Sequence, residues 1–245
     1  MKENNPTHYV AGEGREYMHT CVKLALDACA ELELEKLVVF TGTGEGAQFA
    51  AKEVLSKPDY SKVQVVAVTP PFGRPYFSVI GDTNSPLVYA GVNPAMRDEL
   101  ERLGMTVVAA HLPFKEMYNG RDRTSEWTRV AEAYGVLGGG FALCIQAILV
   151  ACDAGAVFGG ERIVVASADT AFIAIASRTE TFLSPLEGLI VEHIICRPAR
   201  YPISKKHHYM WAPPPPPPPP LTGVAAPPEL PSGSKPKRKK RSQAK

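Results

Sequence analysis

The stretch best suited to binding chemistry is a glycine-rich turn, Thr41-Gly42-Thr43-Gly44-Glu45-Gly46, between an apolar strand and an amphipathic helix. Glycines let the backbone turn sharply, so that amide N–H groups are exposed beside the positive end of the helix dipole. The hydroxyls of Thr41 and Thr43 add further donors. The turn therefore predicts a site for a phosphate or a carboxylate.

The same turn differs from the well-known nucleotide motifs. It lacks the lysine of a Walker A loop, and its glycine spacing is not that of the dinucleotide fingerprint. Glu45 is unfavourable beside an anion, although an acid in the first turn of a helix suits the dipole. The alternative interpretation is a glycine-rich turn that binds no ligand.

Two further segments are expected near this turn. Thr69-Pro70-Pro71-Phe72-Gly73-Arg74 leaves the carboxyl end of the second strand, which borders the same crevice in a doubly wound sheet. Arg74 either supplies a cation to the crevice or is a solvated loop arginine. Asp169-Thr170 is either a plain turn between two strands or a contributor to the crevice.

No metal centre or catalytic constellation is suggested. The five cysteines form no CxxC pair and have no metal-ligand spacing, so we expect buried thiols that act as small apolar groups. The six histidines do not combine with Ser, Cys or Asp in a recognisable catalytic order. The catalytic residues, if there are any, stay unknown from the sequence.

The periodicity predicts an α/β domain that places these segments. Strands are expected at 37–40, 63–68, 106–109, 162–166, 171–176 and 189–196, and helices at 16–34, 47–55, 93–103 and 125–154. Asn93 is a candidate N-cap. The Gly138-Gly139-Gly140 triplet loosens the last helix and indicates either a break near a ligand or close helix packing. Strands separated by helices predict a mostly parallel sheet in a three-layer α/β/α arrangement. The last strands are too close together for helical crossovers, which predicts an antiparallel edge. Residues 72–92 are rich in Gly, Pro, Asn and Asp and indicate an irregular excursion or lid.

The chain changes character near residue 205. We expect a folded domain over 1–205 and a disordered tail over 206–245 that begins with a polyproline II run at 213–220. The tail holds 8 of the 27 basic residues and one of the 25 acids, so the domain carries a net charge of −5. A mildly acidic body does not favour nucleic-acid backbones, so no specific nucleic-acid partner is predicted.

The tail itself suggests partners. The basic cluster Lys235–Arg241 indicates either an import receptor and nuclear localisation or a merely solubilising segment. The proline run either docks on an SH3- or WW-type domain or acts as a spacer. No secretory signal opens the chain and no apolar run is long enough for a membrane span, so we expect a cytoplasmic protein without a membrane partner. The sequence leaves open whether the protein forms a homo-oligomer.

Several segments together resemble stand-alone proteins related to the C-terminal α/β domain of pyruvate kinase. These are the turn Phe40-Thr41-Gly42-Thr43-Gly44-Glu45, the run from Gly139 through Ala154 and the ending Glu192-His193-Ile194-Ile195-Cys196-Arg197-Pro198. Their order and spacing carry the resemblance, which extends over residues 8 to 205. The family implies a mixed sheet between helices.

The resemblance also implies a binding role. In full-length pyruvate kinases this domain is regulatory, and its first strand-to-helix turn holds a phosphate of a sugar-bisphosphate activator. That role falls on Thr41, Gly42, Thr43 and Gly44 here. The catalytic barrel has no counterpart, so pyruvate kinase activity is not expected. Small relatives suggest a phosphate-bearing ligand such as flavin mononucleotide, and the sequence itself fixes no cofactor.

One departure from the family weakens that expectation. Relatives carry a Gly/Arg-rich segment before the residues that match Ala168-Asp169-Thr170-Ala171, and here Val165-Ala166-Ser167 leads straight into them. Three hypotheses follow: a small-ligand-binding domain, a flavin-dependent enzyme of unknown reaction, and an interaction protein that acts through its tail.

Overall fold

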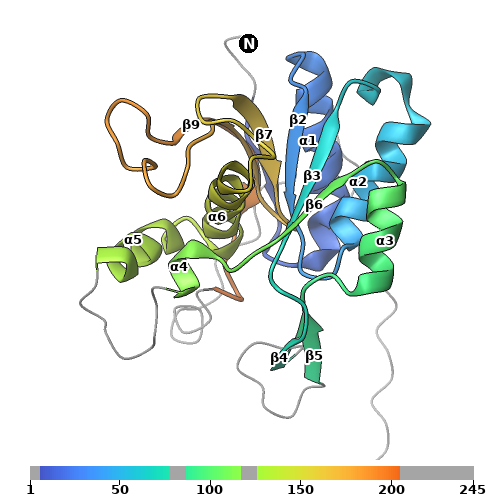
Figure 1. Ribbon diagram of the computed structural model, residues 1–245. Coiled ribbons are helices and arrows are strands. Elements are labelled where there is room, and N and C mark those ends of the chain that lie inside the picture. Colours follow the sequence, from blue (N-terminus) through green and yellow to red (C-terminus); the bar gives the residue numbers. More distant parts are fainter. Residues whose placement is uncertain (1–5, 78–86, 117–125, 205–245) are drawn as a thin grey trace, which may run out of the picture. The chain divides into compact units, whose positions relative to one another are not determined.

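The structure is a computed structural model that describes residues 6–77, 87–116 and 126–204 (Figure 1). The chain divides into two units, Met1–Pro214 and Pro215–Lys245, and all described residues belong to the first. The expected tail, with its proline run and basic cluster, lies outside the described residues.

A seven-stranded sheet forms the centre of the first unit. Its strands are β1 (His8–Val10), β2 (Lys36–Phe40), β3 (Gln64–Thr69), β6 (Thr106–Ala109), β7 (Arg162–Ala166), β8 (Ala171–Ile175) and β9 (Ile190–Pro198). Their order is β1-β9-β8-β7-β2-β3-β6. Only the β7–β8 and β8–β9 pairs are antiparallel. The predicted α/β fold with a mostly parallel mixed sheet is confirmed, and the outermost strand beyond the antiparallel pairs is β1, which the sequence did not predict.

Helices cover both faces of this sheet. One face packs against α1 (Met18–Glu31), α2 (Glu45–Ser56) and α3 (Pro94–Arg102), and the other packs against α6 (Gly139–Asp153) with α5 (Glu126–Gly135) and α4 (Pro113–Glu116) beside it. The single-turn 3-10 helices are η1 (Arg15–Tyr17) and η2 (Pro58–Tyr60).

The valine-rich strands explain this two-sided burial. In β2, Leu37 and Val39 belong to the core under α1 and α2, whereas Val38 belongs to the core under α6. Successive side chains of a strand point to opposite faces, so a sheet covered on both sides needs apolar residues at every position. That requirement is why 37–40 and 65–68 are continuous apolar runs.

The helix expected over 125–154 is wrong as a single element, because the chain forms two helices there. The break falls at 136–138, where Gly138 adopts a positive φ of 98°. A residue with a β-carbon would be strained in that conformation and would overlap the ring of Tyr201. The glycine triplet therefore ends α5 and starts α6.

The irregular excursion expected over 72–92 contains regular structure. The strands β4 (Arg74–Phe77) and β5 (Leu87–Ala90) form a separate antiparallel two-stranded sheet. Residues 78–86 between them lie outside the described residues. Elsewhere the local predictions hold: Asn93 caps α3, with its Oδ1 accepting from the amide of Met96 at 2.9 Å, and all five cysteines are buried and free.

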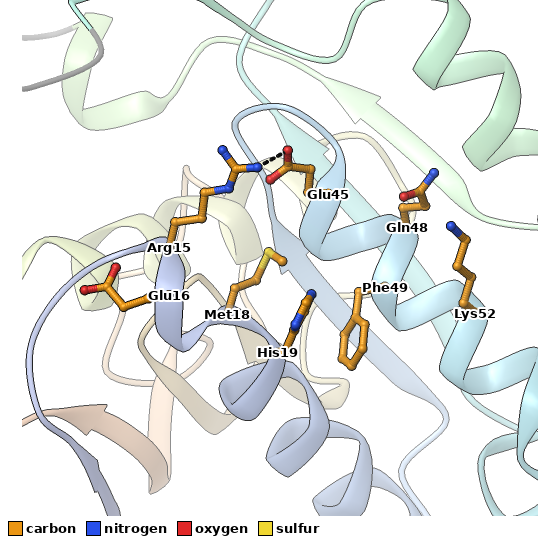
Figure 2. Close-up of a pocket in the computed structure, with 8 residues that line it drawn as sticks. All are labelled: Arg15, Glu16, Met18, His19, Glu45, Gln48, Phe49 and Lys52. Atoms are coloured by element: carbon orange, nitrogen blue, oxygen red, sulfur yellow. Dashed lines mark hydrogen bonds and ion pairs between the residues drawn. The ribbon is translucent and has the colours of Figure 1, made fainter. Parts of the chain in front are cut away.

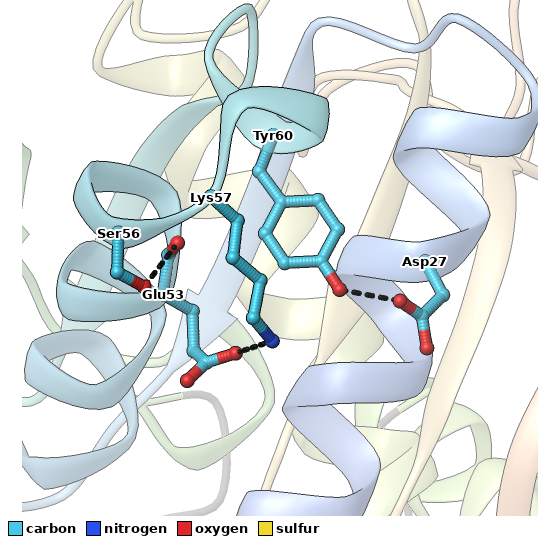
Figure 3. Close-up of polar contacts among 5 residues, drawn as sticks. All are labelled: Asp27, Glu53, Ser56, Lys57 and Tyr60. Carbon is cyan, nitrogen blue, oxygen red and sulfur yellow. Dashed lines mark hydrogen bonds and ion pairs between the residues drawn. The ribbon is translucent and has the colours of Figure 1, made fainter.

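A polar clamp joins α1, α2 and η2 at the edge of the domain away from the glycine-rich turn (Figure 3). The hydroxyl of Tyr60, a residue only 4% exposed, donates to Asp27 of α1. Lys57 pairs with Glu53 at the end of α2, and its ammonium lies 5.3 Å from the centre of the Tyr60 ring. The clamp fixes α2 against α1 at their far ends, which helps to set the spacing of the two helices at their near ends.

Candidate functional site

The predicted site residues all belong to the edge where the parallel strands end. β2 is hydrogen-bonded to β3 on one side and to β7 on the other, with Phe40 opposite Val68 and Val39 opposite Ala166. Thr41, Thr69 and Ser167 therefore stand at the carboxyl ends of three neighbouring strands. This edge is where ligands bind in open α/β sheets.

The turn at 41–46 is held by its own backbone and first threonine. The amide of Gly44 donates to Oγ1 of Thr41 at 2.9 Å, and the amide of Thr41 donates to the carbonyl of Val68 at 2.9 Å. Gly44 has a φ of 98°, and a β-carbon there would lie 2.5 Å from Cγ of Met96. Thr41 thus shapes the turn as an acceptor, and this bond does not use its O–H donor, although the residue is only 5% exposed.

The beginning of α2 is open by comparison. Gly44 is the N-cap residue, and no side chain caps the helix. The first amides of a helix have no acceptor within it, so Glu45 and Gly46 present N–H groups at the positive end of the dipole. Thr43 is exposed, and no atom lies within 4 Å of where a β-carbon on Gly42 would be. These are the groups that a phosphate could contact.

The acid at this helix end has a partner. Glu45 forms an ion pair with Arg15 of η1, whose side chain is 74% exposed (Figure 2). The sequence suggested Arg74 as a cation for the crevice, but the side chain of Arg74 lies outside the described part of the structure. The structure places Arg15 beside the turn instead.

Thr69 and Gly73 are used to close the neighbouring loop. Oγ1 of Thr69 accepts from the amide of Val92 at 3.1 Å and lies 3.2 Å from the carbonyl of Pro70, and the residue is only 1% exposed. Gly73 has a φ of 100° and donates its amide to Ala90. Both residues lie near the predicted crevice, and their contacts here support the loop.

Asp169 and Thr170 are buried against the start of α6. The carboxylate of Asp169 accepts from the amide of Gly14 at 3.0 Å and from the hydroxyl of Thr170 at 3.0 Å. A β-carbon on Gly140 would overlap Oδ1 of Asp169 and lie 2.6 Å from Oγ1 of Thr170. Gly140 is therefore the residue that allows this close approach between the β7–β8 turn and α6.

Burial governs the protonation of Asp169. Removal from water raises the pKa of this carboxyl, and the negative charges of Glu13 and Glu16 raise it further. The hydrogen bonds from Gly14 and Thr170 act in the opposite direction. The thiols of Cys144 and Cys196 also approach this turn, donating to the carbonyls of Thr170 at 3.5 Å and of Asp169 at 3.9 Å.

A second buried acid, Glu13, stands one residue before Gly14. Its carboxylate accepts from the amides of Gly139 at 3.2 Å, Ile203 at 2.9 Å and Ser204 at 2.7 Å, and from the hydroxyl of Ser204. Glu13 thereby occupies the N-terminus of α6 with the protein's own carboxylate. An external anion would find the beginning of α2, rather than that of α6, available.

The segment 13–15 joins the two halves of the predicted site. Glu13 contacts α6, Gly14 contacts Asp169, and Arg15 contacts Glu45 at the glycine-rich turn. The structure therefore brings the 41–46 turn and the Asp169 turn to the edge where the parallel strands end. The segment 13–15 connects them, and this connection was not predicted from the sequence. Its Gly12-Glu13-Gly14-Arg15 pattern before the first helix was the available indication.

A cavity of about 590 Å³ opens between η1, α1 and α2 (Figure 2). Its lining residues are Arg15, Glu16, Met18, His19, Glu45, Gln48, Phe49 and Lys52. Glu45 belongs both to this cavity and to the glycine-rich turn. The volume falls within the range of about 300–1,000 Å³ that small-molecule sites occupy.

Two kinds of site are absent from the described residues. Within 6–77, 87–116 and 126–204, no group of three or more His, Cys, Asp and Glu side chains could hold a metal ion. No helix in the same part of the chain is both long and apolar enough to cross a bilayer.

The comparisons with known proteins show a weak structural likeness and no match in sequence. No protein-family model matches the sequence, and no curated protein matches it. Among solved structures, Cryptosporidium parvum pyruvate kinase in complex with ADP matches with a TM-score of 0.28 and 8% identity, over 74% of this chain and 24% of that one. The chain thus spans about a quarter of that enzyme's length. A similarity this weak supports no conclusion about family or function.

Proposed function

We propose that the folded domain binds a small phosphate-bearing ligand where β2 turns into α2, and that it acts by binding rather than as a pyruvate kinase. The observation that carries the proposal is the uncapped beginning of α2 at the rim of the cavity, with Arg15 beside it. A helix beginning combined with an adjacent cation and an adjoining cavity favours an anionic small molecule.

The chemistry of binding follows from the groups at this rim. Phosphate oxygens would accept from the amides of Glu45 and Gly46 and from the hydroxyl of Thr43. The guanidinium of Arg15 would turn from Glu45 to the phosphate, where its planar fork can donate two hydrogen bonds. Because Arg15 is largely exposed, this turn of the side chain needs no rearrangement of the core.

Flavin mononucleotide is one candidate ligand, and the cavity volume is compatible with a ligand of nucleotide size. The tight β7–β8 connection bears on this choice. The amide of Ser167 donates to the carbonyl of Thr170 at 2.8 Å, so residues 167–170 form a four-residue turn without the Gly/Arg-rich segment of relatives. A ligand here would depend on Arg15 and the α2 turn instead.

Titration calorimetry with inorganic phosphate and with flavin mononucleotide tests the proposal. We expect Thr43→Ala and Arg15→Gln each to weaken binding about tenfold or more, because each removes a hydrogen bond to a charged group. Arg97→Gln is the matched control, since Arg97 pairs with Glu101 on the exposed face of α3. Gly44 is left unchanged because its φ and its contact with Met96 would confound binding with folding.

Two results would contradict the proposal. One is a purified protein that takes up neither phosphate nor flavin mononucleotide. The other is binding that is equally strong in the wild type, Thr43→Ala and Arg15→Gln.

A further inference from the structure

The cavity between α1 and α2 extends well beyond the phosphate-binding turn. Glu45 and Lys52 both line it, and they are seven residues apart on α2. At 1.5 Å per helical residue, this separation is about 10 Å along the helix axis. A ligand whose phosphate binds the backbone amide of Glu45 would therefore have a second part that lies along α2 toward Lys52.

The floor of the cavity is aromatic. His19 of α1 and Phe49 of α2 face each other with ring centroids 4.3 Å apart and an interplanar angle of 30°, and Met18 lies beside them (Figure 2). Met18 and Phe49 are each partly buried against the core, which holds this floor in place. Flat aromatic groups gain about 0.5–1.5 kcal/mol from such ring contacts beyond simple burial.

The far end of the cavity offers a cation. Lys52 has no ion pair or hydrogen bond within the described ranges. Its neighbour Gln48 is already engaged, with Nε2 donating to Oε1 of Glu99 at 2.6 Å. Gln48 is uncharged, so the exposed Lys52 is the cation that this end of the cavity offers to an acidic group.

From these three features we infer that the ligand is a phosphate ester of a planar aromatic ring that carries a second acidic group on the side opposite the phosphate. The phosphate binds at the α2 turn, the ring lies over His19 and Phe49, and the second acid contacts Lys52. This inference rests on the proposed function, because the phosphate fixes one end of the ligand. It adds the class of ligand and two further binding residues.

Calorimetry with phenyl phosphate and 4-carboxyphenyl phosphate tests the inference. We expect the carboxylated compound to bind about threefold more tightly, which is the scale of a partly exposed ion pair. Lys52→Met should abolish that advantage and leave phenyl phosphate binding unchanged, whereas Phe49→Ala should weaken both compounds about fivefold. Lys62→Met, on the exposed turn before β3, is the matched control, and a melting curve for each variant checks the fold.

The outcomes separate this inference from the proposed function. Equal binding of the two compounds, unchanged by Lys52→Met and Phe49→Ala but weakened by Arg15→Gln, overturns the inference and supports the α2 turn as a phosphate site. Tight binding of 4-carboxyphenyl phosphate that needs Lys52 and Phe49, but not Thr43 or Arg15, overturns the phosphate site. Failure of both compounds to bind overturns both.

Discussion

Asp169 is a buried acid whose carboxylate accepts hydrogen bonds from part of its surroundings. Two hydrogen bonds support its carboxylate, yet burial is the larger influence and raises its pKa, with Glu13 and Glu16 adding to the rise. Glu13 differs because four donors converge on it. The two acids thus have separate roles: Glu13 fastens α6 and residues 203–204, and Asp169 fastens the entry to α1.

The raised pKa of Asp169 makes stability depend on pH. A folded-state pKa above the unfolded value means that the folded protein binds more protons between the two values, so this group stabilises the fold at low pH and loses that contribution as the pH rises. Asp169→Asn cannot titrate. We therefore expect the free energy of unfolding of the variant to improve relative to wild type as the pH rises above about 4, the ordinary pKa of an aspartate, as measured by urea denaturation.

The same comparison has a control. Asp98→Asn removes an exposed acid on α3 by the same change of side chain, and its unfolding is measured over the same pH range. A difference that moves the opposite way for Asp169→Asn would mean that its hydrogen bonds outweigh burial.

At the scale of elements, α6 depends on a close approach at its first turn. Gly140 touches Asp169 and Thr170, whereas a β-carbon on Gly139 would have its nearest neighbour, Cβ of Ser204, at 3.5 Å. In an ordinary helix, alanine is more favourable than glycine by about 0.5–1 kcal/mol. We expect Gly140→Ala to lower the free energy of unfolding by about 1–3 kcal/mol through overpacking, and Gly139→Ala to be tolerated, as thermal or urea unfolding would show.

Equal stability of the two alanine variants would contradict this account of the glycine triplet.

The triplet also shows what the sequence could and could not predict. The valine-rich strands were predictable because a sheet buried on both faces requires apolar residues throughout. The Gly138-Gly139-Gly140 triplet indicated either a break or close helix packing without deciding between them, since glycine allows both helical and positive φ.

The candidate site likewise has one part that could be predicted from the sequence and another that could not. Local backbone chemistry marks the 41–46 turn, so it could be predicted from neighbouring residues. Arg15, His19, Phe49 and Lys52 come together only because α1 packs beside α2, and no short-range pattern encodes that packing. Thr41 and Thr69 have the right chemistry at the right edge, yet both are buried. The hydroxyl of Thr69 donates and accepts within its loop, and that of Thr41 accepts from the amide of Gly44.

At the scale of the whole molecule, the charges are divided along the chain. Residues 1–205 are net acidic, and the basic cluster Lys235–Arg241 lies in the tail, outside the described residues. The candidate ligand site uses only residues of the domain, because its lining runs from Arg15 to Lys52. Binding and any tail-dependent localisation should therefore be separable by truncation.

Deletion of residues 206–245 tests that separation. We expect the truncated protein to keep the melting temperature and the phosphate affinity of the full chain, because the described core and the cavity belong to residues before the deletion.

If the basic cluster is an address for an import receptor, a fluorescent fusion of the full chain should be enriched in the nucleus, and replacing Lys237, Arg238, Lys239 and Lys240 with Gln should disperse it. The same distribution for both fusions would leave the cluster as a solubilising segment. A truncated domain that lost phosphate binding would instead show that the tail supports the site.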